Sequence, residues 1–283
     1  MTDTKRYLYE YEDYEDGDKN AATLAEEILS DSDLSSIKTI IVGCWGETYD
    51  NSCQAILDMF SVNSEKLSHI ETLFIGDMDS EECEVSWIEQ GNYSELLKSL
   101  KNLKHLKIKG SNNLSLGELN HTELESLEII CGGLPKSVIF EIANSNLPKL
   151  KKLNLYLGID NYGFDGSLDD IKKLIENRNL KNLDYLGLGN SEIQDEIVEQ
   201  VLNSDIVSNL KVLDFSNGNL SNKGAQLIID NADKLKNLEL LDLHYHFITD
   251  DYVRKLKVLP ININLDEQME NDEEYGNYPM LTE

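Results

Sequence analysis

The sequence predicts an α/β fold in which one short strand and one crossover segment recur along the chain. The first observation is a phrase of apolar residues, spaced L-x-x-L-x-x-L-x-L in "LKNLDYLGLGN" at residues 180–190, that returns many times. The second is that apolar residues at helical spacing fill most of the segments between the copies. Because parallel strands need such crossovers, the two observations together predict a parallel sheet covered by helices.

The core of the phrase begins at eight places, and the steps between them are 33, 33, 21, 26, 33, 27 and 28 residues. Self-similarity at this period is the signature of a solenoid, and the spacing of the apolar residues is that of leucine-rich repeats. The eight starting residues are Ile37, Ile70, Leu103, Leu124, Leu150, Leu183, Leu210 and Leu238.

Each copy predicts a strand whose side chains alternate between the core and an outward face. Leu186 and Leu188 are expected inside, with Tyr185 and Gly187 on the outward face. Residues 110–121 are predicted to form turns, because the 21-residue repeat that contains them is too short for a helix. The predicted crossover helices lie at 53–60, 93–100, 136–145, 168–177, 195–204 and 222–232.

A solenoid needs caps, because its open ends would expose the core. Residues 6–11 are predicted to add a strand, followed by a helix at 21–29, and residues 261–265 a final strand. The acidic stretch that follows is expected to be partly mobile. We therefore predict a single domain over 1–283, with a cap at 1–33, eight repeats at 34–257, and a cap strand and acidic tail at 258–283.

The charge balance restricts the partners, since 53 acidic and 25 basic residues give a net charge of −28. Such a field repels nucleic acid and anionic membranes and favours a protein or peptide with a basic surface. No signal peptide and no apolar run long enough to span a bilayer are recognised. The cysteines form no C-x-x-C pair, which indicates buried thiols in a cytoplasmic protein. They are Cys44, Cys53, Cys83 and Cys131.

The repeats resemble the ribonuclease-inhibitor-like class of leucine-rich-repeat proteins. Nearly the whole chain also resembles a family of bacterial cytosolic leucine-rich-repeat proteins, through phrases such as "IVGCWGETYD", "LDFSNGNLSNKGA" and "LDLHYHFITDD". The resemblance implies a horseshoe with a concave parallel sheet and convex helices, and binding of other proteins on the concave face. It supplies no catalytic residues and no cofactor.

Aligning the repeats places aromatic and acidic residues on the outward face. Tyr156 and Tyr185 flank Gly187 and Gly189, and we expect the glycines to leave a depression with an aromatic rim suited to recognition. The predicted contacts with the partner are Phe74, Tyr156, Tyr185, Asp214, Asp242 and His244.

Two histidines in "LELLDLHYHFITDD" (residues 238–251) raise the alternative of a metal or acid–base site. His244 is predicted to face outward with Asp242, whereas His246 takes the position usually held by an inward-pointing asparagine. A shared metal is therefore disfavoured, because too few ligands converge. Asp250 is expected to cap a short helix at 251–257.

No enzyme motif for phosphate binding, dinucleotide binding, nucleophilic catalysis or zinc is found. Trp87, in the acidic loop 76–90, is expected to be a core anchor. The interpretation is a non-catalytic protein-binding module. The alternatives are a small-ligand or metal-dependent enzyme site at the acidic end of the concave face, and a nucleic-acid regulator, which the net charge disfavours.

Overall fold

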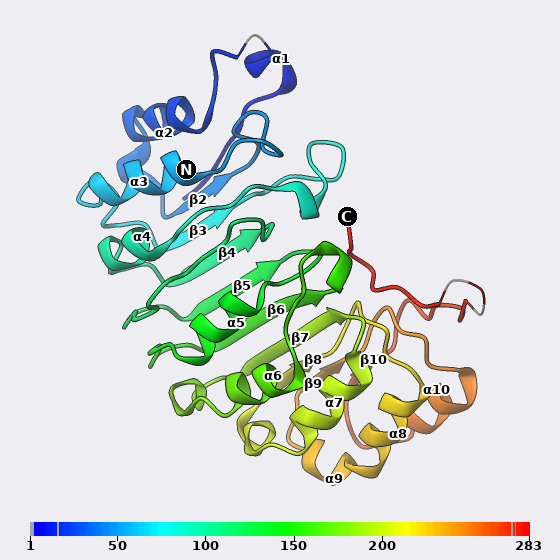
Figure 1. The fold of residues 1–283 in the computed structure, drawn as a ribbon. Coiled ribbons are helices and arrows are strands. Elements are labelled where there is room, and N and C mark those ends of the chain that lie inside the picture. Colours follow the sequence, from blue (N-terminus) through cyan, green and yellow to red (C-terminus); the bar gives the residue numbers. More distant parts are fainter. Residues whose placement is uncertain (1–2, 16, 273, 275) are drawn as a thin grey trace. The chain divides into compact units, whose positions relative to one another are not determined.

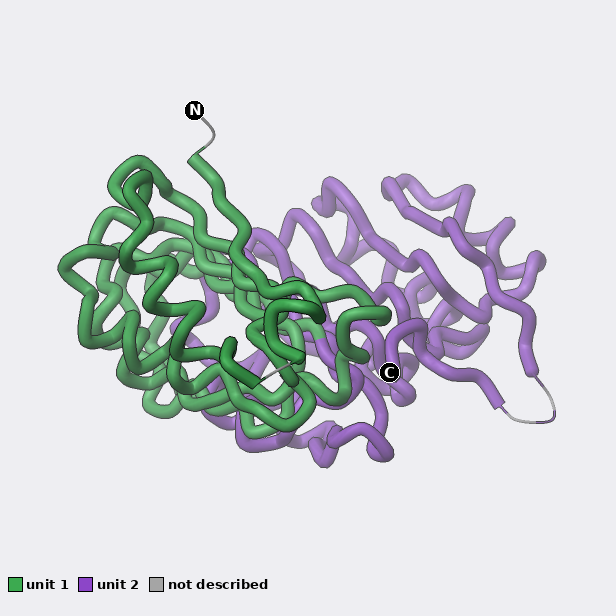
Figure 2. Tube along the Cα trace, turned by 90° about the horizontal axis from the view of Figure 1, so that it is seen from above, with its two compact units in different colours: residues 1–130, 144–150, 283 green, residues 131–143, 151–282 purple. Residues whose placement is uncertain are grey.

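The computed structural model describes residues 3–15, 17–272, 274 and 276–283. It consists of short strands that alternate with helices along the chain (Figure 1). By their contacts, the residues form two compact units (Figure 2). The first unit holds residues 1–130, 144–150 and 283, and the second holds residues 131–143 and 151–282.

The first unit has five parallel strands that pair in chain order. They are β1 (Thr4–Tyr7), β2 (Thr39–Val42), β3 (Thr72–Ile75), β4 (His105–Lys109) and β5 (Ser126–Ile130). Its α-helices are α1 (Tyr11–Tyr14), α2 (Ala21–Ser30), α3 (Gln54–Val62) and α4 (Ser94–Ser99).

The second unit repeats this arrangement with five more parallel strands in chain order. They are β6 (Lys152–Gly158), β7 (Tyr185–Ser191), β8 (Val212–Asp214), β9 (Leu240–Asp242) and β10 (Ile263–Asn264). Its helices are α5 (Lys136–Ala143), α6 (Leu168–Ile175), α7 (Gln194–Leu202), α8 (Asn222–Asp230), α9 (Ala232–Leu235) and α10 (Asp250–Leu256). Helices of successive repeats pack side by side, as α5, α6, α7 and α8 do (Figure 1).

Alternation along the strands separates the core from the outward face, as predicted. Leu186 and Leu188 on β7 are fully buried. Tyr185, the first residue of the same strand, lies on the opposite face and is half-buried. Burying one such leucine contributes about 1.5–3 kcal/mol, and every repeat supplies several. The fold class is therefore confirmed as an α/β leucine-rich-repeat solenoid with a parallel sheet. The single-domain assignment stays a prediction.

All six predicted crossover helices are found within a few residues, and residues 110–121 contain no helix. The first strand begins earlier than predicted, because Tyr11–Tyr14 already form α1. At the other end, β10 covers only two residues of the predicted strand 261–265.

Two local predictions are wrong. Trp87 is 58% exposed, whereas Trp45 is fully buried and its indole Nε1 donates to the Asn51 carbonyl at 2.8 Å. Asp250 is the first residue of α10, and Thr249 takes the N-cap position. The Asp250 carboxylate still lies in the first turn, where the helix dipole stabilises negative charge.

The four cysteines lie buried as thiols. Burial raises the pKa of the Cys53 thiol to about 12, and it also raises the pKa values of Cys44 and Cys83. Only the thiolate is reactive, so we expect the native thiols to react with Ellman's reagent at least about 100-fold more slowly than in guanidinium. Denatured protein should give four equivalents. Rapid native labelling of any one thiol would contradict this.

Candidate functional site

Five of the six predicted contact residues belong to the second unit and come from neighbouring strands. Parallel register sets Gly187 beside Asp214 and Asp214 beside Asp242, and it sets Tyr156 beside Gly189. These pairings match the outward columns predicted from the repeat alignment. We call the outward side of β6–β9, with the residues that follow each strand, the outward face of the second unit.

The sixth residue, Phe74, lies in the first unit and has its own neighbours there. Its ring is contacted by the Lys107 ammonium, which lies 4.9 Å from the ring centroid. Lys107 is also paired with Glu128 on the next strand at 2.7 Å. Lys107 and Glu128 thus form a cross-strand ion pair, and Phe74 contributes an aromatic surface to a separate set of contacts.

Tyr185 and Asp214 hold each other in place on the outward face. The Tyr185 hydroxyl donates to Asp214 Oδ2, and Asp214 Oδ1 accepts from the amide of Ser216 at 2.9 Å. The Lys152 ammonium lies over the Tyr185 ring, 4.9 Å from its centroid. Because both carboxylate oxygens are engaged and Asp214 is buried, its main role is to orient Tyr185.

The two glycines do not leave the depression that was expected beside the tyrosines. A Cβ on Gly187 would overlap Oδ1 of Asn154, which fills that space from β6. A Cβ on Gly189 would overlap the carbonyl of Ser216. The glycines therefore make room for a neighbouring side chain and for the main chain that follows β8.

Asp242 and His244 form a hydrogen-bonded pair at the acidic end. The His244 Nδ1 lies 2.8 Å from Asp242 Oδ1, and the same oxygen accepts from Asn264 Nδ2 at 3.0 Å. A carboxylate beside Nδ1 favours the tautomer that carries its proton there, which leaves Nε2 as an acceptor. The pair can therefore accept a hydrogen bond from a donor such as a lysine or arginine of a partner.

His246 points the other way, as predicted from its position in the repeat. It is fully buried, its Nδ1 accepts from the amide of Ile248 at 3.2 Å, and its Nε2 lies 3.3 Å from the Leu265 carbonyl. Tyr245 between the two histidines has a left-handed backbone, with φ of 56°. The two rings thus do not share a face, and no three metal-ligating side chains converge anywhere in the described part of the chain.

Sequence reasoning missed the residues at the carboxyl ends of the strands. Asn190 is the next-to-last residue of β7, and Asn217 and Tyr245 follow β8 and β9. The three residues take the same repeat position, and all three have positive φ. Asn217 Nδ2 donates to the Tyr156 hydroxyl at 3.2 Å, which ties this edge to the outward face. The available signal was the recurrence of asparagine seven residues after a repeat start, since asparagine tolerates the left-handed conformation.

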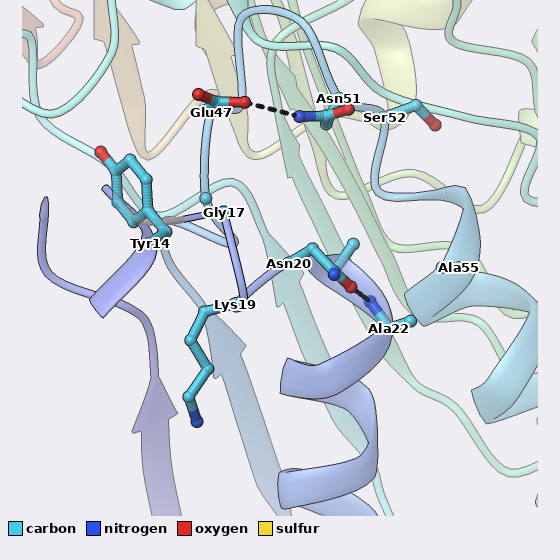
Figure 3. A pocket seen from close by; sticks show the side chains of 11 residues that line it. Tyr14, Gly17, Lys19, Asn20, Ala22, Glu47, Asn51, Ser52 and Ala55 are labelled. Atoms are coloured by element: carbon cyan, nitrogen blue, oxygen red, sulfur yellow. Dashed lines mark hydrogen bonds between the residues drawn. The ribbon is translucent and has the colours of Figure 1, made fainter. Parts of the chain in front are cut away.

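A cavity of about 370 Å³ lies in the first unit, between the start of α2 and the segment 46–55, which ends in the first turn of α3 (Figure 3). Helix N-termini attract anions, but here Asn20 Oδ1 already accepts from the amides of Ala22 and Thr23, at 2.9 and 3.3 Å. Glu47, which lines the same cavity, adds a negative charge. These contacts disfavour an anion site.

No helix among the described residues is both long and apolar enough to cross a membrane.

Comparison with known proteins finds similar solved structures. A scan against protein-family models and a search of curated proteins returned no match. The crystal structure of a Bacteroides fragilis protein is 42% identical, with a TM-score of 0.89, over 98% of this chain and 76% of that one. Two Listeria monocytogenes internalins are each 18% identical. The alignment with internalin inlF covers 85% of this chain and 63% of that one (TM-score 0.41), and that with internalin C2 covers 87% and 93% (TM-score 0.47).

Replacing Gly187 with alanine tests the close packing on the outward face. We expect Gly187→Ala to lower the free energy of unfolding by about 1–3 kcal/mol, because the new Cβ displaces the buried Asn154 side chain. Urea denaturation measures the loss. In an Asn154→Ala background the same substitution should cost less, since the obstructing atoms are gone. An equal cost in both backgrounds would contradict the packing.

The buried His246 should make stability depend on pH. Burial lowers the pKa of His246 below its ordinary value of 6.5, so the unfolded chain binds the proton more tightly than the native one. Its contribution is therefore complete above pH 6.5 and is lost as the pH falls below that value. We expect the melting temperature to fall less between pH 7 and pH 5 in His246→Asn than in the wild type. An equal decrease in melting temperature in the two proteins would refute a contribution of His246 to the pH dependence.

Proposed function

We propose that this chain, which belongs to the same family as the Bacteroides fragilis protein and has a leucine-rich-repeat fold, is a non-catalytic module that binds a protein or peptide. The binding surface is the outward face of the second unit, with Tyr156, Tyr185, Asp214, Asp242 and His244. Phe74 supplies a further contact on the first unit. The ribonuclease-inhibitor-like subclass and the concave shape of the sheet belong to the same proposal.

The observation that carries the proposal is the fixed geometry of this face. Tyr185 is held by Asp214, Tyr156 by Asn217, and His244 by Asp242. Side chains that are already ordered lose less conformational entropy on binding, and aromatic residues of this kind dominate many protein interfaces. The Asp242–His244 pair is bonded to Asn264 rather than to a hydroxyl, thiol or amine nucleophile, which supports recognition over catalysis.

The charge of the chain supports a partner with a basic surface and disfavours nucleic acid and anionic membranes. Asp242 and His244 both offer acceptors to an incoming cation. Four buried thiols support a reducing compartment, so we place the binding in the cytoplasm.

The alternative is a small-ligand or metal-dependent enzyme site at the acidic end of the face. The specific observation in its favour is the 2.8 Å contact between His244 and Asp242, which is the orienting arrangement of an acid–base or metal-binding histidine. Zinc binding by isothermal titration calorimetry separates the two functions. Binding that is lost in His244→Ala would support the alternative.

Site-specific photocrosslinking in living cells tests the proposed surface. Benzoylphenylalanine at Tyr185 or His244 should give discrete protein adducts, whereas the same group at Phe140 should not. Phe140 is a matched control, because it lies on α5 of the same unit and is 60% exposed. In lysate, the adduct yield should fall as salt is raised, since an interaction with a basic partner is screened.

Equal adducts from position 140, or none from positions 185 and 244, would overturn the proposed surface. Adducts that consist of nucleic acid would show a nucleic-acid partner instead, which the net charge disfavours.

A further inference from the structure

The segment 277–282, at the red end of the colour scale in Figure 1, docks on the strand ends of the second unit. The strongest contact is made by Asn190. Its Oδ1 accepts from the Leu281 amide at 2.9 Å, and its Nδ2 donates to the Leu281 carbonyl at 2.6 Å. A carboxamide that bonds both main-chain groups of one residue recognises an extended backbone whatever its side chain.

Three further bonds continue this main-chain recognition. The amide of Met280 donates to the Asn217 carbonyl at 2.8 Å, and Asn219 Nδ2 donates to the Asn277 carbonyl at 2.7 Å. The Tyr245 hydroxyl donates to the Tyr278 carbonyl at 3.4 Å. The backbone of the segment is therefore bonded at four of its six residues.

The side chains of the segment take little part. Tyr278 and Met280 are 54% and 56% exposed, whereas Pro279 is buried. Beyond it, a Cβ on Gly132 would overlap the Thr282 carbonyl, so this glycine leaves only the width of a backbone. The segment is thus held mainly through its backbone, and Pro279 is its one buried residue. We call the strand-end surface on which it lies the groove.

Asn217 connects the groove to the outward face. Its carbonyl accepts from Met280 and its Nδ2 donates to Tyr156 and to Ser216 Oγ, at 3.2 and 3.1 Å. Its buried Oδ1 has no hydrogen-bond partner among the described residues. An occupant of the groove is therefore linked to Tyr156 through Asn217.

We propose that this edge, defined by Gly132, Asn190, Asn217, Asn219 and Tyr245, is a binding groove for an extended, proline-containing peptide segment of a protein partner. Residues 277–282 occupy it as an intramolecular stand-in. The proposal deepens the proposed function and rests on it for the statement that the partner is a protein. Because a tethered segment competes at a millimolar effective concentration, a partner must displace it before it binds.

The test is carried out on the full chain with a labelled peptide of residues 276–282. Leu281→Pro removes the amide N–H that donates to Asn190 Oδ1, so this substitution should release the segment from the groove. Hydrogen exchange verifies the release, because the Met280 amide should exchange at least about tenfold faster than in the wild type. By fluorescence anisotropy, the released variant should bind the peptide at least about tenfold more tightly than the wild type does.

Matched controls separate main-chain recognition from general stickiness. Adding Asn190→Asp or Gly132→Ala to the Leu281→Pro chain should abolish peptide binding. If one of these double variants misfolds, the other one serves as the control. A peptide N-methylated at the Leu281 position should bind at least about tenfold more weakly, whereas a peptide with Met280→Ala should stay within about threefold.

A released, folded variant that fails to bind the peptide would overturn the groove, as would unchanged binding of the N-methylated peptide. A wild-type dimer that dissociates in Leu281→Pro would also overturn it, because the occupant would then be a second copy. Peptide binding with no crosslinking at Tyr185 or His244 would refute the proposed face and leave the groove standing, so the two failures are distinguishable.

Discussion

The alternate burial of apolar side chains along each short strand is the constraint on which the rest of this structure depends. Leu153 and Leu155 on β6 and Leu186 and Leu188 on β7 are fully buried, and parallel register pairs them one repeat apart. A shift by one residue would expose the whole set, so the register is strongly specified. Once it is fixed, every outward side chain has a defined neighbour on the next strand. The recognition surface is in this sense a consequence of the core.

The second constraint acts where each strand ends. The chain must leave the sheet for its crossover, and in several repeats it does so through a residue with a left-handed backbone. Glycine and asparagine adopt this conformation readily, whereas a tyrosine there is strained. Tyr245 has φ of 56°, and its ring stacks edge-on against Phe247 at 5.9 Å. Its hydroxyl then reaches the segment that crosses the strand ends, so the strained residue lies at the proposed groove.

The sequence predicted the strands, the crossover helices and the outward columns because these depend on local periodicity. It also predicted that His244 and His246 point apart, since that follows from where a strand ends. Other features depend on distant contacts that leave no periodic signal. Trp87 is exposed whereas Trp45 is fully buried, and Gly187 lies under Asn154 of the preceding repeat.

The groove is the clearest case of a feature that periodicity does not reveal. Asn190 and Leu281 are 91 residues apart, and "NYPMLT" carries no repeat signature. The recurrent asparagines were visible, but their role depends on a main chain that arrives from elsewhere. In repeat proteins the outward-facing residues of the strands can thus be derived from the sequence. A segment that lies on the strand ends is found only from the structure.

The two proposed surfaces of the second unit are linked by one residue. Asn217 bonds Tyr156 with its side chain and Met280 with its carbonyl, so the position of the Tyr156 hydroxyl depends on the turn that also receives the segment. Removing the segment leaves the Asn217 carbonyl without its bond, and that loss favours any extended chain able to replace it. A partner that supplies an amide there recovers the bond to the residue that also holds Tyr156. The proposed groove and the proposed outward face therefore share Asn217, although each can be tested separately.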